Sequence, residues 1–198
     1  MITKRFFDLF FTIPGLMLLM PLFIIIAVWI RADSPGPVFF RQERVGRKGK
    51  LFYIYKFRTM CVNAEAKGRL VTVADDPRIT SSGAFLRKYK LDELPQLFNV
   101  LLGEMSLVGP RPEVPRYVAL YPNDIRQIVL SVPPGITDYA SIEYKDENVI
   151  LGMAADPDRA YIEEVMPIKL SHYKRYVAER SILKDLLIIL KTIKEIAF

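Results

Sequence analysis

The feature that most constrains this 198-residue chain is an apolar segment close to its N-terminus. From Leu9 to Ile30, 22 consecutive residues carry no charge, and a helix needs roughly 20 apolar residues to cross a bilayer. The segment is too long for the core of a signal peptide, and no small-residue cleavage site follows it before Arg31. It is therefore predicted to hold the protein at a membrane.

Two prolines and the flanking charges determine how this segment is expected to lie. Pro14 and Pro21 interrupt it, and an interior proline removes a backbone hydrogen bond and bends a helix. Positive residues mark the cytosolic side of a membrane, and here they lie on both sides of the segment. A straight spanning helix explains the length, whereas a hairpin that breaks at Pro21 also explains the charges. We therefore expect a membrane-embedded re-entrant helix over residues 1–32 and a cytosolic domain over 33–198.

The net charge of +6 and the cysteine content limit the partners and the compartment. No zinc-finger spacing or RNA-binding aromatic motif is present, so nucleic acid is not an expected partner. A single cysteine, Cys61, excludes an intrachain disulfide and fits a reducing compartment. Anionic headgroups or phosphates are the expected partners, because these basic residues flank the apolar segment: Lys4, Arg5, Arg31, Arg41, Arg44, Arg47, Lys48 and Lys50.

The rest of the chain is predicted to be α+β and mostly helical. Two runs rich in aromatic and β-branched residues, 38–40 and 51–58, predict a small β-hairpin. Loops are expected at 62–82 and 133–144. The last helix has an apolar face that suits either the protein core or the membrane interface. Apolar periodicity places helices at 83–89, 94–103, 113–120, 161–177 and 181–198.

Two adjacent acids at the start of a predicted helix are the first candidates for chemistry. Asp92 and Glu93 precede Pro95, which the first helical turn tolerates. Helix N-termini favour anions, whether carboxylates or a bound phosphate. A capping carboxylate with a solvated neighbour also explains the pair, since adjacent acids are common.

A second element raises the functional interpretation of the acidic pair. Pro110 and Pro112 restrict the backbone around Arg111, and an arginine held in this way offers a bidentate clamp for phosphate oxygens. Each cation taken alone has an ordinary surface-charge explanation. Together they would neutralise a diphosphate, with three further cations upstream of the acidic pair: Lys56, Arg58 and Arg87.

At this point the sequence resembles the monotopic phosphoglycosyl transferases, a family of bacterial sugar transferases. The motifs that carry the resemblance are YKFRTM at 55–60, LDELPQLFNVL at 91–101 and MSLVGPRP at 105–112. They occur in the family's order, behind the N-terminal hydrophobic segment. The resemblance covers nearly the whole chain and is highly specific.

The resemblance implies transfer of a sugar 1-phosphate from a UDP-sugar to polyprenol (undecaprenyl) phosphate, with release of UMP. This is the first membrane step in assembling bacterial glycoconjugates such as O-antigen, capsule, exopolysaccharide or glycoprotein glycans. It makes 33–198 a catalytic domain at the cytoplasmic face of the bacterial inner membrane, with amphipathic interfacial helices around the active site. It further implies that Asp92 forms a covalent aspartyl-phosphosugar intermediate and that Glu93 binds Mg²⁺. Phosphates are expected to bind Lys56, Arg87 and Arg111, with Arg58 as a further candidate.

The sequence departs from the family's pattern at three places. Met20 stands where a serine often precedes the helix-breaking proline. The loop at 135–143 keeps the Pro-Gly-Ile-Thr opening but not the usual glycine- and glutamine-containing continuation. An aspartate common in the late helix is replaced near Tyr173. Because of these departures, the sequence does not identify the sugar that is transferred. It also does not identify the glycan pathway, the oligomeric state or a role for His172.

Two other classes of protein explain part of the sequence. A membrane glycosyltransferase or a lipid-linked hydrolase would use the acidic pair for acid–base chemistry, and the glycosyltransferase would release UDP. A non-catalytic membrane adaptor would bind anionic lipid through its basic face. The adaptor hypothesis does not explain why Asp92, Glu93 and Arg111 occur together.

Overall fold

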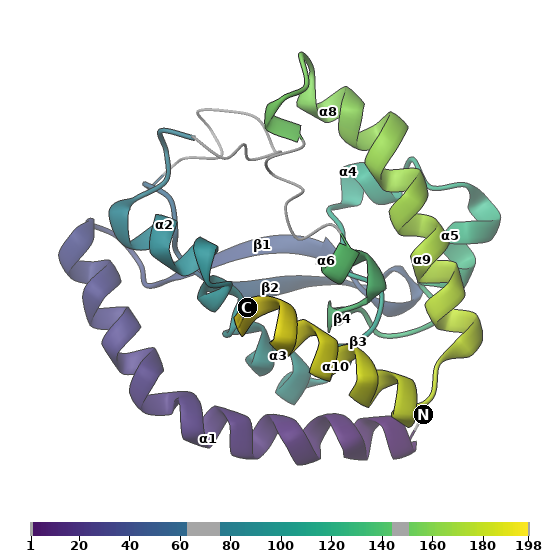
Figure 1. Cartoon of the computed structure of the whole chain (residues 1–198), viewed down its shortest axis with the longest axis horizontal. Helices are drawn as coiled ribbons and strands as arrows, with labels where there is room; N and C mark the ends of the chain where they lie inside the picture. The colour runs from purple at the N-terminus through teal and green to yellow at the C-terminus, as the bar shows by residue number, and fades with distance from the viewer. Residues whose placement is uncertain (1, 63–75, 144–150, 198) are drawn as a thin grey trace.

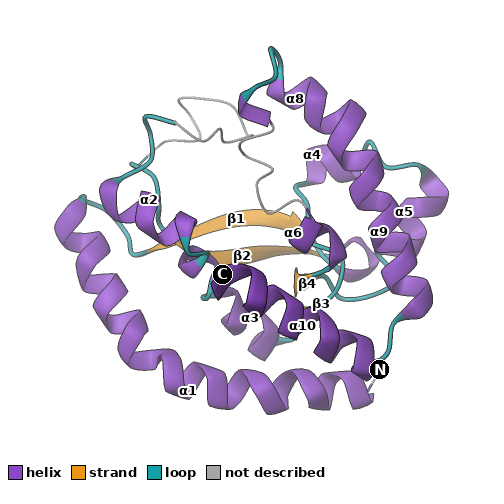
Figure 2. Ribbon diagram, in the orientation of Figure 1, coloured by secondary structure: helices purple, strands orange, loops and turns teal. Residues whose placement is uncertain are grey.

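The structure is a computed structural model that describes residues 2–62, 76–143 and 151–197. It is mostly helical with two small sheets, which confirms the predicted α+β class. Most of the loop predicted at 62–82 lies outside the described residues. Figure 2 shows the strands of a β-hairpin in the middle of the molecule with helices around them.

The first half of the chain contains the predicted hairpin. Strands β1 (Phe39–Val45) and β2 (Leu51–Phe57) pair antiparallel, with Phe39 opposite Phe57 and Val45 opposite Leu51. A 3-10 turn, η1 (Arg47–Gly49), closes its basic tip. Two helices that follow match periodic segments of the sequence, α2 (Ser81–Lys88) and α3 (Gln96–Leu102). The 3-10 turn η3 (Leu91–Glu93) lies between them and was not predicted.

The second half contains a small parallel sheet that the sequence analysis did not predict. Strand β3 (Ser106–Val108) pairs parallel with β4 (Gly135–Thr137). A helix, α6, replaces the end of the loop expected at 133–144. The helices of this half are α4 (Pro115–Val118), α5 (Asn123–Val129), α6 (Tyr139–Glu143), α8 (Pro157–Ala160), the π-helical turn η4 (Tyr161–Val165), α9 (Met166–Glu179) and α10 (Ile182–Ala197).

The apolar segment forms one helix, α1 (Ile2–Asp33), which continues through both Pro14 and Pro21. Its length and composition are sufficient to cross a membrane. Figure 1 shows that α1 bends but does not fold back on itself. A proline removes one hydrogen bond and leaves its neighbours in place, so the break expected at Pro21 is replaced here by a curved, continuous helix.

Helix α1 has one face on the protein and one face without cover. Its inner side is buried against the hairpin and α2 through Phe23, Ile26 and Ile30, which cluster with Phe57 and Leu86. Its outer side is apolar and exposed: Phe10, Met17, Leu18, Ile24, Ile25 and Val28. An exposed apolar surface of this size marks an interaction with a membrane or a partner.

Polar contacts attach both ends of α1 to the same domain. Near the N-terminus, the Lys4 ammonium lies 2.9 Å from a carboxylate oxygen of Asp185 in α10. Arg5 donates hydrogen bonds to two carbonyls of α3. At the C-terminal end of α1, the Asp33 carboxylate accepts hydrogen bonds from the backbone N–H and the hydroxyl of Ser82 at 2.9 and 2.7 Å. The two ends therefore lie on one body of protein.

The structure shows where the apolar face of α10 lies, which the sequence analysis left between the protein core and the membrane interface. Its apolar residues Leu183, Leu187, Leu190 and Ile193 are exposed, whereas Asp185 and Ile188 make the buried contacts. The apolar face therefore does not pack in the core of the chain. This arrangement favours the membrane interface over the core.

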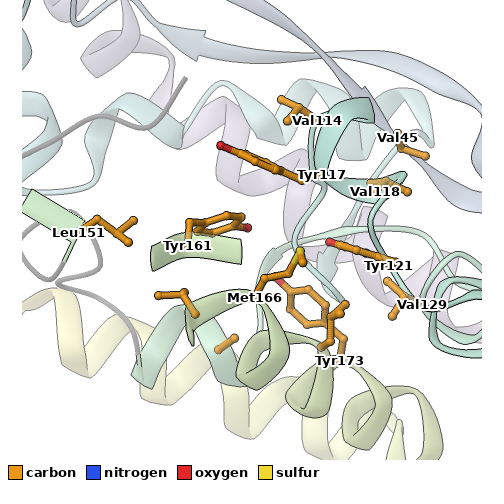
Figure 3. Close-up of a cluster of buried hydrophobic side chains, with 13 residues drawn as sticks. Val45, Val114, Tyr117, Val118, Tyr121, Val129, Leu151, Tyr161, Met166 and Tyr173 are labelled. Carbon is orange, nitrogen blue, oxygen red and sulfur yellow. The ribbon is translucent and has the colours of Figure 1, made fainter. Parts of the chain in front are cut away.

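A buried cluster rich in tyrosine is formed by residues of α4, α5, η4 and α9 (Figure 3). The Tyr161 hydroxyl donates a 2.5 Å hydrogen bond to the carboxylate of Glu113, and Arg44 of β1 forms a 2.9 Å ion pair with the same carboxylate. Tyr117 donates a 2.6 Å hydrogen bond to Asp158. These contacts fix the chain immediately after the Pro110–Pro112 segment.

Candidate active site

The acidic pair lies in the turn η3, directly before α3. Lys90 adopts a left-handed conformation with φ of 55° and starts this turn, and Pro95 then occupies the N-cap of α3. Asp92 is buried, with 6% of its surface exposed, and Glu93 is half-buried. The predicted position just before a helix is therefore correct, although the two acids occupy a separate 3-10 turn.

Cations from two other parts of the chain meet at Glu93. The Lys56 ammonium of β2 lies 2.8 Å from Glu93 Oε1, and the guanidinium of Arg111 donates a hydrogen bond to the same oxygen. The β-hairpin, the turn η3 and the proline-flanked segment therefore converge at Glu93. Among the described residues, both contacts use Oε1, which leaves Oε2 to take a further ligand.

The environment of Glu93 stabilises its anion. Burial alone would raise the pKa of this carboxyl, but the charges of Arg111 and Lys56 and their hydrogen bonds outweigh burial and hold the pKa well below its ordinary value. Burial also opposes the charge of Arg111, and the Glu93 carboxylate outweighs it and raises the arginine pKa. The pair therefore stays ionised throughout the physiological range.

The environment of Asp92 acts in the opposite direction. Burial raises the pKa of Asp92 above its ordinary value, with the negative charge of Glu93 adding to the effect and the charges of Lys56 and Arg87 opposing it. Adjacent carboxyls whose pKa values are driven apart are typical of sites that give them different roles. Here one acid is a fixed anion, and the other is largely shielded from water and has cations nearby.

Arg87 lies on the last turn of α2, shortly before the acidic pair in the sequence. Burial lowers the pKa of its guanidinium, and the charges of Asp92, Asp76 and Glu93 raise it. Arg87 is therefore close enough to the pair to contribute to its field. Lys56 and Arg111 contact Glu93, and Arg87 acts on both acids through its charge; their binding of phosphates stays a prediction.

Arg58 lies beside the end of α1, and its selection as a phosphate ligand stays an untested prediction. Strand β2 ends at Phe57, and the Arg58 side chain turns toward the end of α1. It is 5% exposed, and its guanidinium donates to four carbonyls, those of Pro37, Pro35 and Ser34 at 2.7–2.8 Å and that of Ile30 at 3.4 Å. Three of these carbonyls belong to the turn that follows α1, and the Ile30 carbonyl also accepts a 3.2 Å hydrogen bond from the backbone N–H of Ser34.

Asp138 is the site residue that the sequence analysis missed. It is 1% exposed, and its Oδ2 accepts a 3.1 Å hydrogen bond from the backbone N–H of Arg111. The guanidinium Nη1 of Arg111 donates to the carbonyl of Ile136 at 3.1 Å. The only signal in the sequence was the departure at 135–143, because strands of three residues carry no usable periodicity.

The other departure in the catalytic domain lies close to Asp138. Burial, followed by the charge of Asp138, raises the pKa of the Tyr173 hydroxyl well above its ordinary value, and the charge of Arg111 opposes the rise. Tyr173 is therefore neutral. An acid in the loop and a neutral tyrosine in the late helix both lie beside Arg111.

The acidic pair fits a metal that is shared with a substrate. Among the described residues, no group of three or more histidine, cysteine, aspartate or glutamate side chains could hold a metal by itself. Mg²⁺ is usually bound by one or two carboxylates together with substrate phosphates. Asp92 and Oε2 of Glu93 offer that donor set, so the residues present fit Mg²⁺ bound with a diphosphate.

These features first define a class of protein. An exposed apolar helix and a partly buried carboxylate pair with cations nearby are the features of a membrane-associated domain with an anion-binding site. Comparison with known sequences then gives the family. The sequence model of the protein family described as "Bacterial sugar transferase" matches residues 1–198, and the chain belongs to this family. The resemblance noted in the sequence is confirmed.

Individual relatives share the sequence over most of this chain. A protein of Aeromonas hydrophila named UDP-N-acetylgalactosamine-undecaprenyl-phosphate N-acetylgalactosaminephosphotransferase is 40% identical over 195 residues, 98% of this chain and 43% of that protein. A UDP-glucose:undecaprenyl-phosphate glucose-1-phosphate transferase of Escherichia coli (strain K12) is 37% identical over 192 residues, 96% of this chain and 39% of the relative. A protein of the same name from Xanthomonas campestris pv. campestris is 45% identical over 145 residues, 71% and 30% of the two chains. The chain thus spans less than half the length of these relatives.

Proposed function

We propose that this chain transfers a sugar 1-phosphate from a UDP-sugar to polyprenol (undecaprenyl) phosphate and releases UMP. The observation that carries the proposal is the convergence of Asp92 and Glu93 with Lys56 and Arg111. A carboxylate among fixed cations suits attack on a diphosphate, because phosphoryl transfer depends mainly on positioning and charge neutralisation. The names of the relatives support the same class of substrates.

The proposed reaction has two steps that share one nucleophile. A carboxylate oxygen of Asp92 attacks the phosphorus next to the sugar, and the bond from that phosphorus to the bridging oxygen breaks, so UMP leaves with the electron pair. An oxygen of the lipid phosphate then attacks the resulting acyl phosphate and frees the Asp92 carboxylate. A carboxylate is an established covalent carrier in such chemistry.

The cations have separate tasks in this scheme. Arg111, held between two prolines and by Glu93, presents N–H donors to diphosphate oxygens. Lys56 and Arg87 oppose the charge that the phosphates bring to the acidic pair. Mg²⁺, when bound by Glu93 and Asp92, would supply further neutralisation of the diphosphate.

The product distinguishes this proposal from its alternatives. Purified protein with Mg²⁺, undecaprenyl phosphate and UDP-N-acetylgalactosamine or UDP-glucose, or another member of a UDP-sugar panel, is expected to release UMP. Chelation with EDTA should reduce the rate by roughly 10²-fold, since metal neutralisation of a diphosphate contributes several kcal/mol, and added Mg²⁺ should restore it. Release of UDP instead would favour a glycosyltransferase. No product from any sugar of the panel would favour a membrane adaptor.

We also infer that α1 enters and leaves the membrane on the cytoplasmic side of the inner membrane. Two observations support a re-entrant position. Lys4 and Arg5 at one end and Asp33 at the other bind the same domain, whereas a spanning helix would hold its ends roughly 30 Å apart across hydrocarbon. The exposed apolar faces of α1 and α10 would both rest in the bilayer.

Labelling with a membrane-impermeant maleimide tests this position. Cys61 is exposed and reports the catalytic domain; Ile2→Cys in a Cys61→Ser background reports the N-terminus, where Ile2 is 89% exposed. Both thiols are expected to react only after spheroplasts are lysed. A periplasmic cysteine protein serves as the positive control for labelling. Reaction of the residue-2 thiol in intact spheroplasts would establish a spanning helix.

A further inference from the structure

The parallel pairing of β3 and β4 brings together two segments that are far apart in the sequence. Ser106 pairs with Gly135 and Val108 with Thr137. Because parallel strands end at the same edge of a sheet, the residues that follow them meet there. Asp138 directly follows β4, and Arg111 follows β3 after Gly109 and Pro110. The backbone N–H of Gly109 extends the contact by donating to the carbonyl of Thr137 at 3.1 Å.

The two carboxylate oxygens of Asp138 have different partners. Oδ2 accepts from the backbone N–H of Arg111 at 3.1 Å, and Oδ1 accepts from the backbone N–H of Ser141 at 2.6 Å. The second contact caps the short helix α6. The first fixes the backbone of Arg111, whose side chain is further held by the Ile136 carbonyl and by Glu93. Asp138 is 1% exposed, so water competes little with either contact.

We propose that Asp138 is a positioning residue that holds Arg111 in the orientation needed to bind the diphosphate. The inference rests on the proposed function. It adds to the proposed active site a residue from the segment that directly follows β4. An arginine side chain is long and flexible, so the direction of its backbone determines where the guanidinium reaches. A charged acceptor on the Arg111 N–H fixes that direction more firmly than the flanking prolines alone, which restrict φ and not the rotation of the whole segment.

Asparagine at position 138 separates the two roles of the carboxylate. Its amide oxygen can still accept from Ser141 and cap α6, but its NH₂ group would then face the N–H of Arg111, donor against donor. Asp156→Asn is a matched control, because Oδ1 of Asp156 caps α8 by accepting from the N–H groups of Asp158 and Arg159 at 3.1 and 3.2 Å. The control makes the same chemical change at another helix start.

The experiment measures kcat and KM for UMP release by the wild type, Asp138→Asn, Arg111→Ala and the double variant, with thermal unfolding of each. Asp138→Asn is expected to lower kcat/KM by roughly ten- to a hundred-fold, the range for loss of a hydrogen bond to a charged group, and Asp156→Asn by less than about three-fold. In the Arg111→Ala background, Asp138→Asn should cost less than about three-fold, because residues that act through one another are not additive.

Two results would overturn the inference. One is a full additional loss in the Arg111→Ala background, and the other is a lower unfolding temperature for Asp138→Asn with kcat/KM unchanged. Failure of the proposed function is recognised separately, because the wild type would then release no UMP. In that case the role of Asp138 is tested by the affinity for Mg²⁺·UDP, measured by calorimetry on the same four proteins. The effects of the two substitutions on this affinity are expected to be non-additive, and additive effects would refute the role of Asp138.

Discussion

Replacement of Asp92 by asparagine is expected to reduce UMP release by roughly 10⁴-fold or more, the scale seen when a covalent nucleophile is removed. The amide has nearly the same shape as the carboxylate but cannot form an acyl phosphate. Initial rates with a saturating UDP-sugar and undecaprenyl phosphate measure the effect. Labelled sugar phosphate should be trapped on the wild type when lipid acceptor is omitted, and not on the variant. If Asp92→Asn retained substantial UMP release, the nucleophile assignment would be wrong.

The stability of the same variant provides the control. Burial raises the pKa of Asp92 in the folded protein, so its ionised form is less favourable in the folded state than in the unfolded state at neutral pH. A neutral amide removes that cost, and Asp92→Asn should unfold at a temperature no lower than the wild type. Asp124→Asn, a change at an exposed acid at the start of α5, should leave both rate and stability unchanged.

The raised pKa also determines the sign of the pH dependence. Asp92 must be ionised to attack, so the rate should fall as the pH drops through its folded-state pKa, which lies above the ordinary value of 3.8. Glu93 behaves in the opposite way. Its lowered pKa contributes stability above its unfolded value of about 4.5, and this stability is lost only as the pH falls below that value toward the folded pKa. Loss of activity on the acidic side should therefore precede loss of structure.

The parts of the site that sequence could predict are those with a local signal. A proline pair around Arg111 and an acidic pair before a helix are visible in short stretches of sequence, and Lys56 lies in a run whose aromatic and β-branched residues predict a strand. Arg58 was placed in the same predicted strand, but β2 ends at Phe57 and the Arg58 side chain binds carbonyls between Ile30 and Pro37. Strand alternation does not report where a strand stops.

Non-local contacts account for what the sequence left undecided. Asp138 acquires its partner through a parallel pairing of two three-residue strands, and neither strand is long enough to show a period. The apolar face of α10 has the same pattern whether protein or membrane covers it, and only the position of Asp185 and Ile188 decides. In α1, proline predicts a bend, while the contacts of Lys4 and Asp33 determine where both ends lie.

Among the substitutions proposed as tests, replacement of Arg58 by methionine is expected to lower the free energy of unfolding most. The variant keeps the apolar stem and removes the donors that bind four carbonyls between Ile30 and Pro37. A hydrogen bond from a charged group contributes about 1.5–3 kcal/mol, and water offsets part of the loss here because Pro35 and Pro37 are exposed. A net loss of about 3 kcal/mol would lower the unfolding temperature by roughly 6–12 °C in a chain of this size. Thermal unfolding in detergent measures it.

The same variant separates the structural role of Arg58 from the phosphate-binding role first expected of it. A residue that only attaches α1 to the hairpin should change kcat and KM by less than about three-fold at temperatures where the variant is folded. Arg41→Met, a change at an exposed arginine on β1 that lies over the Tyr55 ring, should lower stability by no more than about 1 kcal/mol. A KM for the UDP-sugar that rises ten-fold in Arg58→Met, with an unchanged unfolding temperature, would return Arg58 to the substrate site, since the guanidinium would then be binding phosphate instead of carbonyls.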